Sequence, residues 1–178
     1  MKAFCLAVFL AMSFTDSGRG QTTARITRDG SMVISDGRYR FRIADVVVPP
    51  RASISPPRVH AVLKRHGGYF VLVTTCERSR GGTGGGYCGC GEEDYLRWMH
   101  IVDKRVCEHV HFRYRSCFDN REGGIQGWKG SIFTVTTEDL LEDRLLAKET
   151  DIWQEITYTF DADHPEAGIR EEKASPHP

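Results

Sequence analysis

The sequence predicts a mainly β fold: a single antiparallel sheet or sandwich domain with one or two short helices, stabilised by disulfides. Three stretches, residues 38–44, 107–117 and 151–160, alternate apolar and polar side chains at period two. This alternation is typical of strands with one buried and one wetted face. Two further runs, 69–75 and 131–136, are rich in β-branched and aromatic residues, as strands are. Because the alternating stretches each have a polar face, antiparallel pairing is favoured.

Two segments carry helical signals. Residues 59–63 place apolar side chains at helical spacing between Pro57 and a Gly-Gly pair, and proline before with glycine after is typical of a helix. Residues 138–148 begin with acids and end with bases, which suits the helix dipole. In contrast, residues 48–57 contain two Pro-Pro pairs, so we expect an extended connection without regular pairing there.

Residues 92–104 fit two structures. Tyr95, Trp98, Met99 and Val102 have the spacing of an amphipathic helix, but other apolar residues fill the opposite side. A segment that is apolar on all sides is also typical of a central strand. We favour a strand here, as the first arm of a hairpin that turns at residues 103–105. The numbers of facing residues would then sum to about 208.

The N-terminus has the features of a secretory signal. Lys2 precedes an apolar run over residues 3–12, and this run is much shorter than the ~20 residues that span a membrane. We therefore expect residues 1–20 to be a signal peptide, 21–160 to form the β-rich domain and 161–178 to form a loose polar tail. The domain would be periplasmic or secreted and would have no membrane span.

The charge balance and the motifs exclude several functional classes. Lys plus Arg and Asp plus Glu both number 24, so no net field favours nucleic acid or an anionic membrane, and a protein partner is expected. The glycine-rich run contains G-x-G-x-x-G at Gly84, Gly86 and Gly89, but no strand leads directly into it and no βαβ unit follows. We expect a surface loop and no cofactor. The sequence has no G-x-S-x-G, H-E-x-x-H or S-x-x-K motif.

His109 and His111 form an H-x-H pair that would project from one face of a strand, together with Cys107. Zinc needs a third or fourth ligand, and His60, His66 and His100 are open candidates for it. Polar side chains on the wet face of a strand explain the pair equally well, so no metal site is predicted. Acidic clusters at residues 92–94, and at Glu138, Asp139, Glu142 and Asp143, are interpreted as structural.

Five cysteines follow the signal peptide, which suggests two disulfides and one remaining thiol in an oxidising compartment. If residues 107–117 form one strand, Cys107 and Cys117 are ~33 Å apart, and a bridge needs less than ~7 Å. The hairpin register instead places Cys117 beside Cys90 and within reach of Cys88. Cys107 is then predicted to pair with Cys76.

The run Gly-Tyr-Cys-Gly-Cys-Gly-Glu-Glu-Asp-Tyr-Leu from Gly86, followed later by Ser116-Cys117, resembles a pattern of small, largely uncharacterised exported proteins of Gram-negative bacteria. The equivalent of Cys90 is usually a small residue there, so the resemblance implies a bridge between Cys88 and Cys117. Residues 79–87 are similar in composition to the Ser/Gly-rich loop that periplasmic lysozyme inhibitors insert into an enzyme cleft. Because that loop ends in tyrosine, the similarity implies a binding role for Tyr87.

The leading hypothesis is therefore an exported, non-catalytic binding module of the inhibitor or immunity type that acts on a cell-wall enzyme. One alternative is a metal-dependent or carboxylate-based hydrolase that uses His109, His111 and residues 92–94. A second alternative is a structural protein of the cell envelope. An enzyme should show a concave pocket where histidines and carboxylates converge, whereas a binder should show an exposed loop or patch.

Overall fold

The computed structural model describes residues 22–37, 39–44, 53–78, 91–116, 121–141 and 152–177. These residues form three antiparallel sheets in which strands adjacent in sequence are paired. The N-terminal sheet contains β1 (Thr22–Ile26), β2 (Met32–Asp36) and β3 (Tyr39–Ile43). The central sheet contains β4 (Ser53–Arg65), β5 (Gly68–Arg78), β6 (Glu92–Val102) and β7 (Arg105–Ser116). The C-terminal sheet contains β8 (Glu122–Lys129), β9 (Ile132–Leu140), β10 (Trp153–Asp161) and β11 (Ile169–Lys173), with a short 3₁₀ helix, η1 (Pro165–Ala167), before β11.

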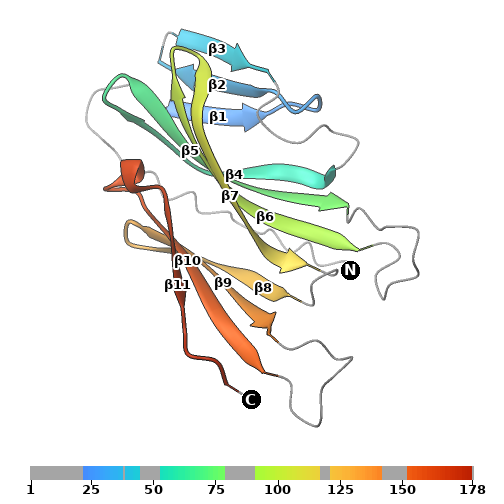
Figure 1. The fold of residues 1–178 in the computed structure, drawn as a ribbon. Helices are drawn as coiled ribbons and strands as arrows, with labels where there is room; N and C mark the ends of the chain where they lie inside the picture. The colour runs from blue at the N-terminus through green and yellow to red at the C-terminus, as the bar shows by residue number, and fades with distance from the viewer. Residues whose placement is uncertain are drawn as a thin grey trace, which may run out of the picture.

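The central sheet lies between the other two sheets, so the fold has three β layers (Figure 1). Alternate side chains of β5 and β6 point to opposite faces. Phe70 and Trp98 pack toward the C-terminal sheet, while Val71 and Met99 pack toward the N-terminal sheet. Because both faces of these strands are buried, β6 is apolar on all sides. This explains why its sequence also fits a helix.

The predicted hairpin over residues 92–104 is confirmed. β6 pairs with β7 across a turn at Asp103 and Lys104, and the facing residues from Tyr95–Arg113 to His100–Glu108 sum to 208. The other strands predicted from residue alternation and composition are confirmed as β3, β5, β9 and β10. The fold is therefore mainly β, although it has three sheets instead of the single sheet or two-sheet sandwich that we expected.

The helix predicted over residues 59–63 is wrong, because this segment belongs to β4. The β4–β5 register shifts between Val59 and Ala61, which marks a β-bulge or irregularity. An extra residue in a strand places side chains at positions i and i+3 on the same face. Val59 and Val62 accordingly both pack against the N-terminal core, so the bulged strand imitates helical spacing.

The other predictions about irregular and helical segments were also wrong where the structure describes them. Residues 53–57, expected to be unpaired, begin β4, and 138–140 end β9; residues 48–52 and 142–148 lie outside the described residues. Within the described part of the chain, η1 is the sole helical element, and no helix there is long and apolar enough to cross a membrane.

Residues 161–177 do not form a loose tail. β11 pairs with β10 from Ile156–Lys173 to Phe160–Ile169. The Trp98 indole Nε1 donates a hydrogen bond to the Pro165 carbonyl oxygen at 3.0 Å, which ties η1 to the central sheet. The folded domain therefore extends to β11, and residues 1–20, expected to be the signal peptide, lie outside the described residues.

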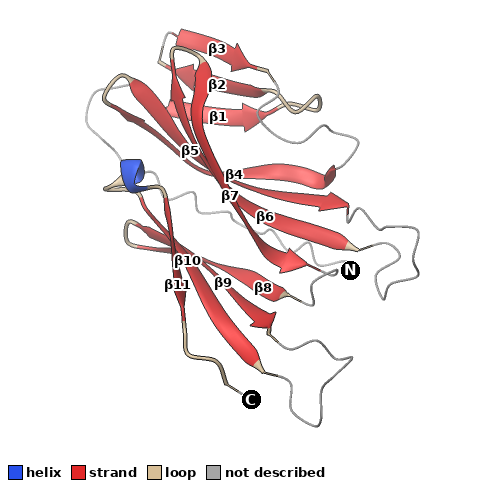
Figure 2. Cartoon of the chain, viewed as in Figure 1, coloured by secondary structure: helices blue, strands red, loops and turns tan. Residues whose placement is uncertain are grey.

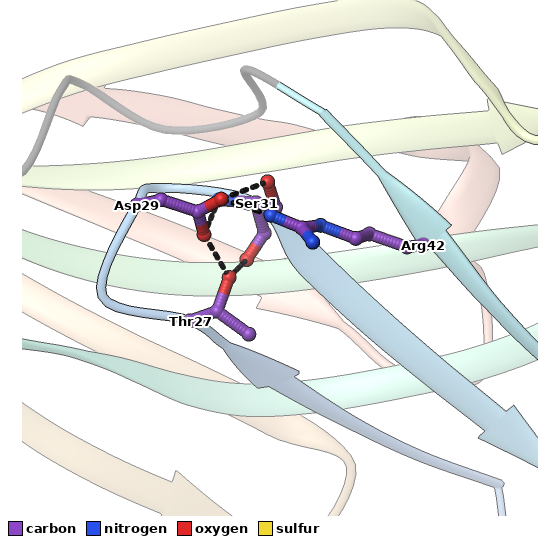
Figure 3. A network of polar contacts seen from close by, with 4 residues as sticks. All are labelled: Thr27, Asp29, Ser31 and Arg42. Carbon is purple, nitrogen blue, oxygen red and sulfur yellow. Dashed lines mark hydrogen bonds and ion pairs between the residues drawn. The ribbon is translucent and has the colours of Figure 1, made fainter.

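Side-chain contacts close the turn between β1 and β2 and tie it to β3 (Figure 3). The Thr27 hydroxyl lies 2.5 Å from Asp29 Oδ1 and 2.8 Å from the Ser31 carbonyl oxygen. The Ser31 hydroxyl donates to Asp29 Oδ2 at 3.2 Å, and Arg42 forms an ion pair with the same carboxylate. The hydrogen bond from Thr27 is the main cause that lowers the pKa of Asp29. Each of these polar groups has a partner within the turn, so we interpret the network as structural.

Candidate functional site

The two ends of the central sheet differ in how their strands are connected. At one end, which we call the turn end, two-residue turns join β4 to β5 and β6 to β7 (tan in Figure 2). At the other end, which we call the groove end, β5 and β6 are joined by residues 79–90, and residues 45–52 and 117–120 also lead to and from this end. All three connections lie outside the described residues.

The groove end carries an open groove with a volume of about 760 Å³. Its lining residues come from β1, from the first half of β4, from the ends of β5, β6 and β7 that lie here, and from Ile125 of β8. The lining combines apolar contacts from Ile26, Val59 and Ile125 with polar and charged side chains. This mixture is typical of a recognition surface.

The acidic groups of the groove are held by one arginine. Arg115 Nε donates to Asp94 Oδ2 at 2.6 Å, and Arg115 Nη2 donates to Glu92 Oε2 at 3.0 Å. The hydrogen bond to Asp94 is the main cause that raises the pKa of Arg115. The carboxylates of Asp94 and Glu92 are therefore both bound to a guanidinium within the groove.

Two other titratable groups of the groove carry their protons at neutral pH. Burial, reinforced by a hydrogen bond to Asp94, raises the pKa of the Cys76 thiol to about 12. Burial also raises the pKa of Tyr114, whose ring packs in the core between the central and C-terminal sheets. Since the thiolate is the nucleophilic form of cysteine, Cys76 is poorly suited to nucleophilic catalysis.

Arg25 and Arg58 give the groove its available positive charge. Both line it, both have exposed side chains, and neither takes part in an ion pair among the described residues. An arginine fork that is not already paired can bind a carboxylate with two parallel hydrogen bonds. The groove can therefore accept an acidic group from a partner.

The carboxylates of residues 92–94 do not form a catalytic pair. Glu93 binds Arg113 Nη1 at 3.2 Å, whereas Asp94 and Glu92 bind Arg115. Arg97 is buried and forms an ion pair with Glu77. The structural interpretation of the cluster is thus supported by ion pairs that already occupy its carboxylates. In the second acidic cluster, Asp139 binds Arg121 Nη2 at 2.5 Å, and residues 142–143 lie outside the described residues.

His109 and His111 lie together on β7, as the H-x-H spacing predicts. Their ring centroids are 5.5 Å apart, both side chains are exposed, and they lie opposite Met99 and Arg97 of β6. Partial burial, with the positive charge of Arg97 and the neighbouring His111, lowers the pKa of His109. The acidic residues 92–94 lie at the start of β6, several residues before Arg97 and Met99. The histidines and carboxylates of the hydrolase alternative therefore do not converge.

The histidines that we considered as further ligands are elsewhere. His60 contacts Phe133 of the C-terminal sheet at 4.5 Å between ring centroids, and its Nε2 is 2.8 Å from Thr74 Oγ1. His66 is in the β4–β5 turn, and His100 stacks on Phe70 at 4.4 Å. Within the residues that the structure describes, no group of three or more His, Cys, Asp or Glu side chains is placed to hold a metal ion.

The predicted Cys76–Cys107 disulfide is wrong for this structure. Cys76 faces Asp94 at the groove end, while Cys107 is exposed beside the β6–β7 turn, with its Sγ 3.8 Å from the Arg105 carbonyl oxygen. Cys107 is the neighbour of Glu108, which pairs with His100. Asp94 and His100 are six positions apart on β6, so the two cysteines are on the order of 20 Å apart. A disulfide needs Cα atoms within about 7 Å.

The implied Cys88–Cys117 bridge and the binding role of Tyr87 fall on residues outside the described part of the chain. Both stay predictions. The expectation that Cys117 bridges to Cys88 or Cys90 came from the predicted hairpin register; the observed β6–β7 register ends with Glu93 opposite Ser116. Peptide mapping without reduction is the direct check of the bridge.

Arg25 and Arg58 were not predicted from the sequence, because both belong to segments without a clear strand pattern. Arg58 directly follows Pro56-Pro57. Proline within a strand signals an edge strand, since it cannot donate to a ladder of hydrogen bonds. Given that signal, β4 would have been recognised as an edge strand whose polar side chains border an open surface.

Comparisons with known protein families, with curated proteins and with solved structures found no match for this chain.

Proposed function

We propose that the chain is an exported, non-catalytic binding module that engages a protein partner through the groove end of its central sheet. The partner class we propose is a cell-wall enzyme, which the module would inhibit or neutralise in the periplasm or outside the cell. The proposal rests above all on one observation: the groove is open and bordered by Arg25 and Arg58, while its own carboxylates are bound to Arg115.

The connectivity of the strands supports a recognition role for the same end. The glycine-rich connection 79–90, which contains Tyr87, starts after β5 and ends before β6. Cys76 near the end of β5 and Glu92 at the start of β6 both line the groove. Binding residues are often carried on loops that a rigid scaffold positions, and here β5 and β6, which are buried on both faces, provide that scaffold.

The experiment is affinity capture from a periplasmic extract, followed by an assay of peptidoglycan hydrolysis by the captured enzyme. We expect the wild-type protein to retain a cell-wall hydrolase and to inhibit it. Arg58→Glu should abolish both effects, because it places a carboxylate where an acidic group of the partner would bind. Arg65→Glu is the matched control: it makes the same charge change on β4, at the turn end.

Equal capture by Arg58→Glu and wild type would refute the assignment of the groove as the binding surface. Degradation of peptidoglycan by the purified protein itself would refute the non-catalytic role and favour the hydrolase alternative. If wild type neither captures nor inhibits a cell-wall enzyme, the proposed partner class is wrong.

A further inference from the structure

The middle of β7 is an exposed edge strand. β7 is the last strand of the central sheet (Figure 1), and residues 107–111 are exposed on both faces. Val110 retains 41 % of its accessible surface. Among the described residues, no strand pairs with the outer edge of β7 between Glu108 and Phe112.

An unpaired edge presents a row of N–H and C=O groups that another strand can bind. Proteins usually block such edges with proline, lysine or a bulge. Residues 106–112 contain neither proline nor lysine. The β6–β7 register runs without a shift from the pair Tyr95–Arg113 to the pair His100–Glu108. The edge of β7 is therefore regular over residues 108–113.

This regular edge carries the H-x-H pair. His109 and His111 point to one face of the strand, and their ring centroids are 5.5 Å apart. The nearest cationic side chain of β6, Arg97, forms an ion pair with Glu77. Two adjacent imidazoles are half of a tetrahedral zinc site, and the described residues of one chain supply no third ligand.

We propose that β7 pairs antiparallel with β7 of a second copy about a two-fold axis at Val110, and that the four imidazoles brought together bind one Zn²⁺. In this register His109 of each copy lies opposite His111 of the other. Residues directly opposite in an antiparallel pair share a face, with Cβ atoms about 4.5–5.5 Å apart. All four rings therefore project from the same face of the joined sheet.

The side chains favour this register over its neighbours. Because opposite residues share a face, the two-fold axis of a symmetric pair must pass through a residue. The nearest alternative registers therefore have their axis at His109 or at His111. An axis at His109 would place Cys107 opposite His111, and an axis at His111 would place His109 opposite Arg113. Of these three axes, the one at Val110 alone places two imidazoles of one copy directly opposite two imidazoles of the other. The interface is isologous, as in most homodimers.

The test is the molar mass of the purified protein by light scattering and sedimentation, titrated with zinc chloride and then with EDTA, in a phosphine reductant that prevents disulfide-linked dimers. We expect a monomer in EDTA and a dimer with one zinc per two chains. His109→Ala and His111→Ala should each abolish the zinc-dependent dimer. His66→Ala, in the exposed β4–β5 turn, is the matched control and should dimerise as wild type does.

Two more variants separate the metal from the strand edge. Val110→Lys should abolish the dimer although both histidines remain, because it places two lysines against each other at the axis. Cys107→Ser should leave the zinc-dependent dimer unchanged. Three results would overturn the proposal: no change of mass with stoichiometric zinc, binding of one zinc per monomer that is equal in wild type and Val110→Lys, or a dimer that persists in EDTA and in His109→Ala.

Discussion

The turn end and the groove end of the central sheet are built from the same four strands but have opposite character. At the turn end, Phe70 and Trp98 are buried, their ring centroids lie 5.9 Å apart, and Trp98 is hydrogen-bonded to Pro165 of η1. At the groove end, the same strands carry Cys76, Asp94 and Arg115 around an open groove. Burial of apolar surface dominates one end, and paired charges dominate the other.

This difference separates stability from recognition along a single sheet. Apolar contacts inside a three-layer core are insensitive to the identity of a partner, so they can hold the scaffold fixed. Charged groups at the rim gain specificity from complementary charges on another molecule. We therefore expect substitutions at the turn end to change mainly the free energy of unfolding, and most substitutions in the groove to change mainly binding.

The largest expected effect is at the turn end. Trp98→Ala removes a side chain that is 3 % exposed and the hydrogen bond to the Pro165 carbonyl oxygen. We expect the free energy of unfolding to fall by about 3–5 kcal/mol. Ile125→Ala, at a groove residue that is 38 % exposed, is the matched control and should cost about 1 kcal/mol. Equal losses in urea unfolding would mean that the two ends contribute alike.

The next effect concerns the place where the C-terminal sheet meets β7. A Cβ at Gly123 would lie 2.0 Å from the Tyr114 carbonyl oxygen and 2.8 Å from the Thr136 carbonyl oxygen. Both atoms belong to the backbone, so Gly123→Ala must move a strand, and we expect a loss of about 3 kcal/mol.

Gly124→Ala is the control, because a Cβ there meets nothing within 4 Å. It should change the free energy of unfolding by less than about 0.5 kcal/mol. This prediction sharpens the comparison, since Tyr114 also lines the groove. If Gly123→Ala is as stable as Gly124→Ala, the contact between Gly123 of β8 and Tyr114 of β7 is not a fixed part of the groove end.

The pattern of side chains was enough to predict the strands that alternate or are rich in β-branched residues. It failed for β4 because a shift in register gives Val59 and Val62 the spacing of a helix. It failed for β11 because only Ile169 of that short strand packs against the core, so its sequence looks like a solvated tail. Periodicity thus identifies regular strands with a wide apolar face, and it misses bulged or short edge strands.

The candidate site was less predictable than the fold. The H-x-H pair was placed correctly on one strand because its spacing is local. In contrast, the groove depends on contacts between β1, β4 and β7, which are far apart in sequence. The Cys76–Cys107 pairing failed for the same reason: it followed from elimination among cysteines, and the register that places these residues near opposite ends of the sheet comes from long-range pairing.

His60 predicts how stability depends on pH. Burial is the main cause that lowers its pKa from 6.5 to about 4, with a further contribution from Arg58. The unfolded chain therefore binds a proton between pH 6.5 and 4 that the folded protein does not bind, so the free energy of unfolding falls as the pH is lowered through this window. We expect a loss of about 2 kcal/mol. This is less than the value obtained by multiplying 1.36 kcal/mol per pKa unit by the whole difference between 6.5 and 4, because the ring is partly exposed.

Urea unfolding at a series of pH values measures this dependence. His60→Gln should remove that part of the slope, because glutamine does not titrate. His66→Gln, at an exposed histidine just beyond the end of the same strand, should keep the slope of wild type. A slope between pH 6.5 and 4 that is unchanged in His60→Gln would show that other groups cause the acid sensitivity.

The smallest expected effect compares the two turns of the turn end. Both are two-residue connections whose central residues have positive φ: 45° and 80° at His66 and Gly67, and 48° and 62° at Asp103 and Lys104. Such turns strongly favour glycine at the second position. Only the first turn has it, so Lys104 occupies a backbone conformation that lysine adopts at a cost.

Lys104→Gly should therefore stabilise the protein by about 0.5 kcal/mol, since the relief of strain exceeds the larger entropy that glycine gives the unfolded chain. Gly67→Ala should have the opposite sign and cost about 1 kcal/mol. A Cβ at Gly67 meets nothing within 4 Å, so this loss would report backbone strain alone. Thermal and urea unfolding of the two variants together measure the pair. Effects of the same sign would mean that the two turns do not obey one rule, and that the β6–β7 turn is held by contacts outside its own backbone.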